Sequence, residues 1–327
     1  MNTKTTTNNT KKVLPLSSYK TDFINKMNSP KTRISTGLKD LDIFFNGGFT
    51  EGIYALAAES SSGKSALMQF FAQSIAKNGD LVLYFTTEMA AHEFIGRGIS
   101  YTSYVENSLD SSKPKYTISD ILGYSYNKDL DEFFHVRPEQ YMEYYEKWFD
   151  NYSENFNIVT DGINGISSND IVETTKSFID SNKDRSIVVF VDYLQLVKAN
   201  EDQSQNDRKN KLDNTIKALK GLSMDYHLPI FVASSIGRAS YGAEKIGMGA
   251  FKESGDIEYT SDVCLGWASD QNSPDNGVYR TMNLDILKYR NGIKGARQKI
   301  YYFPAYNYFT MKKPKTTQES GSNIVFV

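Results

Sequence analysis

The sequence predicts an α/β protein with a mainly parallel central sheet, covered by helices and followed by a C-terminal antiparallel hairpin. Apolar runs suited to buried strands recur between positions 53 and 287, with helical stretches between the earlier ones. Such alternation is typical of a parallel sheet with helices on both faces. With 327 residues, of which 39% are hydrophobic and 13% aromatic, the chain is long enough to bury a large core.

Short apolar runs give the expected strands. They cover residues 53–57, 81–85, 156–159, 187–191, 230–233, 263–267 and 282–287. The segment 107–150 is rich in Tyr and Asp, and we expect it to be helical with long surface loops. No internal repeat interrupts this pattern.

One large domain with a short extension at each end is the predicted organisation. The expected parts are a flexible arm at 1–30, the α/β domain at 31–315 and a C-terminal tail at 316–327. Within the arm, a short amphipathic helix is predicted by apolar side chains at helical spacing, namely Tyr19, Phe23, Ile24 and Met27. This helix has no core of its own, so it docks either on a neighbouring subunit or back on its own domain.

Composition excludes several classes of protein. No stretch approaches the roughly 18 uninterrupted apolar residues of a membrane span, and the first thirty residues lack a secretory signal, so we expect a cytoplasmic protein. The single cysteine, Cys264, lies in an apolar run and is expected in the core. A net charge of −2 argues against nonspecific coating of nucleic acid but leaves room for a local basic groove.

Residues 58–65, with the sequence AESSSGKS, form a predicted phosphate-binding P-loop between a strand and a helix. Backbone N–H groups of such a loop surround phosphate, while Lys64 reaches the outer phosphates and Ser65 ligates Mg²⁺. The nucleotide-holding residues expected here are Ser60, Ser61, Ser62, Gly63, Lys64 and Ser65. Ala58 replaces the usual first Gly, and the alternative interpretation is a Ser- and Gly-rich turn before an ordinary helix.

Two acidic residues follow predicted strands. Asp192 ends the run 187–191, at the edge where ligands of parallel sheets gather, and is predicted to hold Mg²⁺ through water. Glu88 follows the run 81–85 and is a candidate general base for the attacking water. Many strands end in Asp for turn reasons, and Glu88 is alternatively a carboxylate that stabilises a helix N-terminus.

Several motifs resemble those of DnaB-type replicative helicases, in order from about residue 32 to residue 311. Residues 192–196 read D-Y-L-Q-L, and residues 252–258 are similar to the family's R-E-S-G-S-I-E segment. Residues 288–292 are similar to its K-x-R-N-G motif, and 87–89 to its L-E-M. Matches also occur at 35–38 and 41–42, and the family's P-loop shares the Ala found at position 58.

This resemblance implies a RecA-like ATPase domain that hydrolyses ATP between the subunits of a ring and moves along single-stranded DNA. Lys64 and Ser65 would then hold phosphate and Mg²⁺, Glu88 would activate water, and Asp192 would order the metal. Arg290 matches the family's arginine finger, which acts on the neighbour's γ-phosphate, with Lys288 beside it. Without the motif match, an isolated Arg in a β-hairpin is more often a solvated charge.

Two loops correspond to segments that line the central channel in this family. They cover residues 198–211 and 238–252, and their basic residues are Arg208, Lys209, Lys211, Arg238, Lys245 and Lys252. Such side chains suit contacts with backbone phosphates of single-stranded DNA, with no reading of bases. Acidic residues share both loops, so a solvated surface of mixed charge is the alternative.

The chain departs from the family pattern in two places. Ser235 stands where the family has a Gln that senses the γ-phosphate, and only about thirty residues precede the ATPase core, where full-length helicases carry an N-terminal domain. We therefore expect a helicase of a phage or mobile element, forming a homo-oligomer, most simply a hexameric ring, with a loader or primase as further partners. The alternatives are a RadA- or KaiC-like ATP-dependent switch without unwinding activity and, more weakly supported, a small-molecule kinase.

Overall fold

The computed structural model describes residues 14–28, 33–127, 132–134, 136–160, 165–198, 208–237, 241–243, 245–251, 255–273 and 275–314. The chain divides into two compact units, Met1–Thr32 and Arg33–Val327. In the first unit, η1 (Leu16–Tyr19) leads into the helix α1 (Lys20–Asn28). The apolar side chains of Tyr19, Phe23, Ile24 and Met27 are exposed there.

A nine-stranded sheet forms the centre of the second unit, in the order β11-β10-β9-β8-β1-β7-β6-β2-β5. Its strands are β1 (Gly52–Ala58), β2 (Leu81–Thr86), β5 (Phe156–Thr160), β6 (Ile187–Asp192), β7 (Pro229–Ser235), β8 (Val263–Ser269), β9 (Arg280–Tyr289), β10 (Arg297–Phe303) and β11 (Tyr308–Thr310). Every apolar run predicted as a strand is part of one of these strands. From β8 to β5 all neighbours are parallel, and β9, β10 and β11 continue the sheet in antiparallel pairs. The predicted fold class is confirmed.

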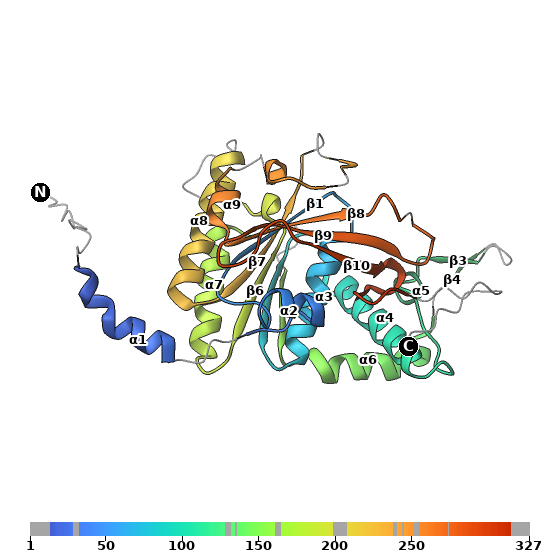
Figure 1. The fold of residues 1–327 in the computed structure, drawn as a ribbon. Helices are drawn as coiled ribbons and strands as arrows, with labels where there is room; N and C mark the ends of the chain where they lie inside the picture. The colour runs from blue at the N-terminus through green and yellow to red at the C-terminus, as the bar shows by residue number, and fades with distance from the viewer. Residues whose placement is uncertain are drawn as a thin grey trace, which may run out of the picture. The chain divides into compact units, whose positions relative to one another are not determined.

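Helices cover both faces of the sheet, as Figure 1 shows with α3, α4 and α6 on one side and α7, α8 and α9 on the other. The first group is α2 (Lys39–Phe44), α3 (Lys64–Lys77), α4 (Ala91–Leu109) and α6 (Pro138–Tyr152). The second group is α7 (Ser168–Ser181), α8 (Arg208–Tyr226) and α9 (Gly255–Thr260). Each face buries its own apolar cluster, and the expected core position of Cys264 is confirmed. The described helices include none that is long and apolar enough to cross a membrane.

The segment 107–150 contains more strand than its composition indicates. It includes the end of α4, the short helix α5 (Ile118–Leu122), the strands β3 (Ser125–Asn127) and β4 (Glu132–Phe134), and most of α6. The strands β3 and β4 pair with each other as a two-stranded sheet. The expectation of helices joined by loops therefore missed this hairpin, whose strands are too short to give a periodic pattern.

The central sheet has two opposite ends, which are defined by the direction of its parallel strands. The parallel strands β1, β2, β6 and β7 all end at one edge, which we call the carboxyl edge, and the P-loop leaves β1 there to enter α3. The opposite edge, where β1 and β8 begin, we call the amino edge. Ligands of parallel sheets bind at the carboxyl edge, where strand ends and helix N-termini meet.

Candidate nucleotide-binding site

The P-loop turns sharply between β1 and α3. Ser61 and Gly63 have φ values of 60° and 89°, and α3 begins at Lys64. A Cβ atom at Gly63 would lie 2.7 Å from a ring carbon of Tyr302, so this position needs glycine for both its backbone angle and the close approach. The loop is also held from outside, because the indole N–H of Trp267 donates to the carbonyl of Ser62 at 2.9 Å. The backbone therefore forms a preorganised concave turn suited to an anion.

Lys64 is largely buried, with 7% of the residue exposed. Its Nζ donates to Ser235 Oγ at 3.0 Å and lies 4.6 Å from the ring centroid of Tyr193. Burial lowers the pKa of Lys64, while the negative charges of Asp192 and Glu88 act in the opposite direction. A buried ammonium with these neighbours retains a strong attraction for additional negative charge.

Asp192 is completely buried at the end of β6. Burial raises its pKa, while the Ser65 hydroxyl, the Lys64 ammonium and the Tyr84 hydroxyl act to lower it. Tyr84 donates to Oδ2 at 3.0 Å, and Oδ1 has no hydrogen-bond partner among the residues that the structure describes. An unpartnered buried carboxylate oxygen close to a serine hydroxyl fits a hydrated Mg²⁺, a hard cation that prefers oxygen ligands.

Glu88 and Ser235 complete the group that the fold brings together. Glu88 follows β2 and is exposed, and its charge is close enough to act on the pKa of Lys64. Ser235 is the last residue of β7, beside Ala58 of β1 in the sheet register. The carboxyl edge thus brings together five predicted residues, namely Lys64, Ser65, Glu88, Asp192 and Ser235.

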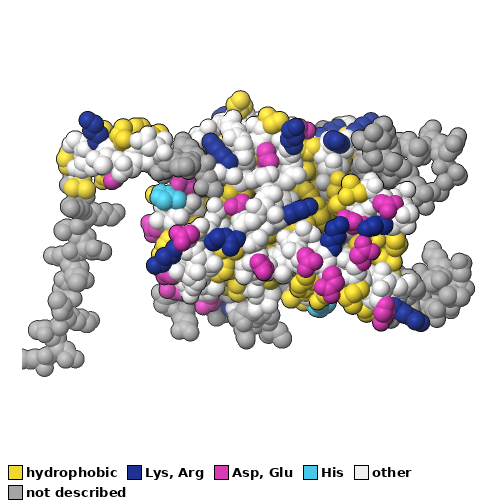
Figure 2. Space-filling view, turned by 90° about the horizontal axis from the view of Figure 1, so that it is seen from below, with side chains coloured by type: hydrophobic (Ala, Val, Ile, Leu, Met, Phe, Trp, Pro, Cys, Tyr) yellow, Lys and Arg dark blue, Asp and Glu magenta, His cyan; other side chains and the backbone are white. Residues whose placement is uncertain are grey.

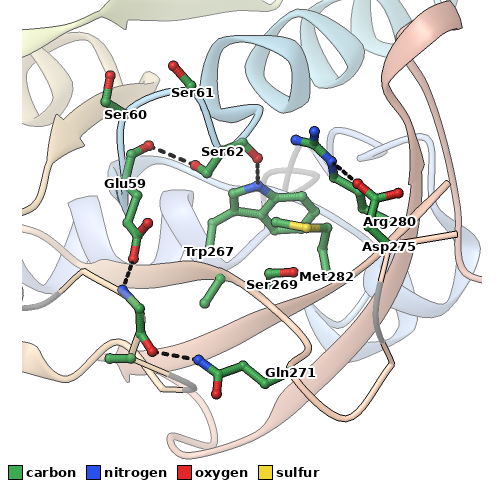
Figure 3. Close-up of a pocket in the computed structure, with 13 residues that line it drawn as sticks. Glu59, Ser60, Ser61, Ser62, Trp267, Ser269, Gln271, Asp275, Arg280 and Met282 are labelled. Carbon is green, nitrogen blue, oxygen red and sulfur yellow. Dashed lines mark hydrogen bonds and ion pairs between the residues drawn. The ribbon is translucent and has the colours of Figure 1, made fainter. Parts of the chain in front are cut away.

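A hollow of about 270 Å³ adjoins the outer side of the P-loop. Residues 59–62 line it together with Trp267, Met282 and the ion pair of Arg280 with Asp275, and Figure 3 shows the side chains of Ser60 and Ser61 pointing away from the indole. Glu59 of the P-loop accepts a hydrogen bond from the backbone N–H of Gly242. The hollow therefore lies between the phosphate-binding turn and the strands β8 and β9.

Arg290 and Lys288 lie at the amino edge, away from the P-loop of their own chain. The guanidinium of Arg290 is half exposed and is 3.4 Å from Asp262 Oδ1, and Asp262 Oδ2 in turn accepts from Ile53 N at 2.8 Å at the start of β1. Lys288 Nζ donates to the carbonyl of Glu258 at 2.7 Å. The seven residues of β1 separate this edge from the P-loop by about 20 Å at roughly 3.3 Å per residue. The structure does not bring these two residues to the Lys64 site.

The structure places only part of the predicted DNA-binding set. Lys211 lies in the first turns of α8, with Nζ 3.4 Å from the carbonyl of Gln195, and Lys245 is exposed after β7. Arg238 and Lys252 lie outside the described residues, as do the side chains of Arg208 and Lys209.

Charge on the surface is mixed elsewhere. On the face that Figure 2 shows, Lys and Arg side chains are interspersed with Asp and Glu side chains over the described residues. The described residues of this face therefore show no continuous track of positive charge.

Sequence reasoning missed several side chains of the site. Tyr84 and Trp267 lie within apolar strands, where they look like ordinary core residues until the sheet aligns them with Asp192 and the P-loop. Tyr193 and Gln195 belong to the D-Y-L-Q-L tract, but no pattern in the sequence shows that they face Lys64 and β7. Arg97 of α4 was also missed, and its charge acts to lower the pKa of Asp192.

Curated helicases resemble this chain over different shares of its length. A replicative DNA helicase DnaB of Geobacillus stearothermophilus is 24% identical over 282 residues, covering 85% of this chain and 56% of the relative. A probable plasmid replicative DNA helicase of Chlamydia muridarum is 34% identical over 94 residues, covering 28% of this chain and 20% of the relative. The chain spans about half the length of the DnaB helicases it matches.

Solved structures share the fold. One, described as a DnaB-like replicative helicase and its interactions with primase, has a TM-score of 0.70 at 20% identity and covers 90% of this chain and 67% of its own. Another, described as an ATPase domain, has a TM-score of 0.68 at 19% identity, covering 89% of this chain and 95% of its own. The family described as DnaB-like helicase C terminal domain matches residues 33–311. The resemblance read from the sequence motifs is confirmed, and the chain belongs to the family of DnaB-like helicase C-terminal domains.

Proposed function

We propose that this chain is an ATP-hydrolysing motor that moves along single-stranded DNA as a helicase in DNA replication. The observation that carries the proposal is the carboxyl-edge cluster, in which a P-loop lysine, the buried carboxylate of Asp192 and the nearby charge of Glu88 converge. Family membership favours this motor over the RadA- or KaiC-like switch. A P-loop alone would not distinguish the two, because the same fold serves several functions.

ATP and Mg²⁺ are the proposed ligands of the cluster. Ser60, Ser61, Ser62 and Gly63 would surround the phosphates with backbone N–H groups, and Lys64 would hold the outer ones. Mg²⁺ would be held by Ser65 directly and Asp192 through water, and it supplies neutralisation of developing phosphate charge. Glu88 would take a proton from the attacking water, and Ser235 would contact the phosphate end through its hydroxyl. The hollow beside the P-loop would receive the nucleoside part.

A second copy of the chain would complete each site. Arg290 lies about 20 Å from its own P-loop along β1, so it would act on the nucleotide of a neighbour, with Lys288 beside it. Arg suits this role because its planar fork meets two phosphate oxygens at once. We propose a homo-oligomer, most simply a hexameric ring, in which every seam contains one nucleotide.

Single-stranded DNA would be bound by the loops that leave the carboxyl edge. These loops carry Arg208, Lys209, Lys211, Arg238, Lys245 and Lys252. A loader or primase is a further proposed partner, since one structural neighbour is described with primase and the proposed ring needs assembly on DNA. The similarity to a plasmid helicase supports a role in a phage or mobile element, in the cytoplasm of the host. The division into arm, 31–315 domain and tail also belongs to this proposal.

The test is a titration of ATPase rate with single-stranded DNA, combined with native mass and with strand separation of a forked duplex. A motor is expected to show DNA-stimulated hydrolysis, strand separation and an oligomeric mass. Slow hydrolysis that is indifferent to DNA, without strand separation, would contradict the proposal and support the switch. Phosphorylated small-molecule products would instead identify a kinase.

A further inference from the structure

The carboxyl end of β7 extends past its neighbour β6. The register pairs Val191 with Val232, and β6 ends at Asp192, whereas β7 continues to Ser235. On its other side, Ser235 remains in register with Ala58 of β1. The backbone of Ser235 therefore needs hydrogen-bond partners on the β6 side from outside that strand.

The side-chain amide of Gln195 supplies these partners. Its Oε1 accepts from Ser235 N at 3.3 Å, and its Nε2 donates to Ser235 O at 3.3 Å and to Ser234 Oγ at 2.9 Å. A carboxamide carries the same donor and acceptor groups as a peptide unit. Gln195 thus extends the sheet ladder beyond the end of β6 with a side chain in place of a strand.

Gln195 is itself held firmly. Only 7% of the residue is exposed, and it lies in the single turn η3 (Leu194–Leu196) directly after β6. Its own carbonyl accepts from Lys211 Nζ at 3.4 Å, which ties the turn to α8. A buried amide fixed at both ends has little freedom to release Ser235.

The position of Ser235 also affects Lys64. Ser235 Oγ accepts from Lys64 Nζ at 3.0 Å, so the position of the β7 end sets where this hydroxyl meets the P-loop ammonium. Serine is short, and a shift of its backbone by about 1 Å would break the contact. Orientation of groups at this scale changes reaction rates strongly, because catalysis depends on geometry in the transition state.

We propose that Gln195 is a positioning residue for ATP hydrolysis, acting through the backbone of Ser235 to place its hydroxyl against Lys64. Gln195 does not touch the nucleotide in this scheme. The inference rests on the proposed ATPase function and adds a residue to it. Gln195 would thus fix the position of Ser235, whose side chain is shorter than the Gln that the family has at this point.

Two substitutions test the proposal. Gln195→Glu keeps the shape and the acceptor but loses the Nε2 donor, and Gln195→Met keeps the length but loses both groups. Each is expected to lower kcat roughly tenfold, the change in rate that corresponds to the free energy of about one hydrogen bond. The affinity for a fluorescent nucleotide is expected to stay within twofold of wild type. Ser223→Ala is the matched control, because Ser223 is also buried and donates to Leu228 O at the opposite end of β7.

A double-variant cycle separates positioning from general damage. If Gln195 acts through Ser235, Ser235→Ala alone lowers kcat to a similar extent, and adding Gln195→Met lowers it no further. Additive losses, or a Ser235→Ala variant with unchanged kcat, would overturn the proposal. So would Gln195 variants that behave as the Ser223 control or lose nucleotide affinity in proportion to kcat.

Failure of the wider proposal looks different. A wild-type chain without ATPase activity would refute the proposed function itself. A wild-type chain that hydrolyses ATP alongside Gln195 variants of normal kcat would refute only the role of Gln195. Urea unfolding of each variant, compared with Ser223→Ala, identifies any loss that comes from a destabilised fold.

Discussion

The two edges of the sheet differ in how deeply their charged side chains are buried and in how these are paired. At the carboxyl edge, Lys64 and Asp192 are buried, and Asp192 Oδ1 has no partner among the described residues. At the amino edge, the half-exposed Arg290 lies beside Asp262, whose carboxylate also binds Lys220 at 2.6 Å. The carboxyl edge therefore buries a cation and a carboxylate oxygen without a described partner, whereas the exposed cation at the amino edge is paired within the chain.

Lys64 and Arg290 therefore lie at opposite edges of the sheet, as the proposed site shared between two subunits requires. Burial at the carboxyl edge keeps charges strong, because the local dielectric is low. Exposure at the amino edge leaves Arg290 free to exchange Asp262 for another anion at small cost, since half-exposed ion pairs contribute little. In the proposed ring, a neighbour's triphosphate would be the second partner of this guanidinium.

Replacing the amino-edge cation is expected to have the largest effect. Arg290→Ala should lower kcat for ATP by roughly 10³–10⁵, the usual value of an arginine finger, and leave nucleotide affinity unchanged. Steady-state ATPase assays and a fluorescent nucleotide titration measure the two quantities. Lys294→Ala, an exposed cation in the same turn, is the control and should behave as wild type. Equal loss of binding and turnover would contradict the assignment.

A mixture of two inactive variants tests whether the two sheet edges of neighbouring chains form one site. Lys64→Ala destroys the carboxyl-edge half and Arg290→Ala the amino-edge half, so a mixed oligomer contains some seams with both halves intact. We expect the mixture to regain ATPase activity that neither variant shows alone, measured against the total chain concentration. A mixture that stays as inactive as its components would argue against shared sites.

Removing the metal-directed charge is the next largest change. Asp192→Asn is nearly isosteric and should weaken the apparent affinity for Mg²⁺ by roughly 10–100-fold, as expected when an outer-shell ligand is lost. Mg²⁺ titrations of ATPase activity measure this. Tyr84→Phe removes only the hydroxyl that donates to Oδ2, so its Mg²⁺ affinity should stay close to wild type. If both variants lost Mg²⁺ affinity to a similar extent, the loss would come from altered packing around Asp192 and not from the missing charge.

Breaking the amino-edge anchor tests stability. Asp262→Ala leaves Ile53 N and Lys220 without their carboxylate and should reduce the free energy of unfolding by about 1–3 kcal/mol. Urea denaturation provides the measurement. Asp275→Ala removes a more exposed ion pair with Arg280 and should cost at most about 1 kcal/mol. If both substitutions reduced the free energy of unfolding equally, the Asp262 carboxylate would contribute no more to stability than the more exposed Asp275.

The smallest expected effect concerns DNA. Replacing Arg208 and Lys209 together with Ala should weaken single-strand affinity and reduce the salt dependence of binding by a slope of about 0.7 for each phosphate that the variant no longer neutralises. Fluorescence anisotropy at several salt concentrations gives both values. Replacing Lys312 and Lys313 after β11 with Ala is the control, and an isotherm unchanged across salt would remove the pair at 208 and 209 from the interface.

Buried strands were the most predictable part of the fold. Each expected strand forms because short, continuous apolar runs between turns have few alternatives to a sheet covered on both faces. The β3–β4 hairpin was missed, since strands of three residues carry no periodicity. The order of the strands in the sheet could not be predicted from the apolar pattern either, because it depends on which apolar faces pack together.

Within the candidate site, the residues that belong to motifs were predictable, whereas the residues that contact and support them were not. Lys64, Ser65 and Asp192 occur where phosphate and metal chemistry requires particular residue types next to strand ends. Trp267 lies 205 positions from the carbonyl it binds, and no local pattern reports a contact at that separation. Arg290 was found through its motif, and only the fold shows that it is remote from its own P-loop.

Strands, the P-loop motif and the family could be predicted from residue types and their spacing, because these set local backbone preferences and the pattern of motifs. Only the folded chain shows that Gln195 completes the ladder of β7, that Trp267 supports the P-loop, and that Arg290 and Lys64 lie at opposite edges. The physical reason is that these relations join segments distant in the chain, and parallel packing of the strands sets which of them meet.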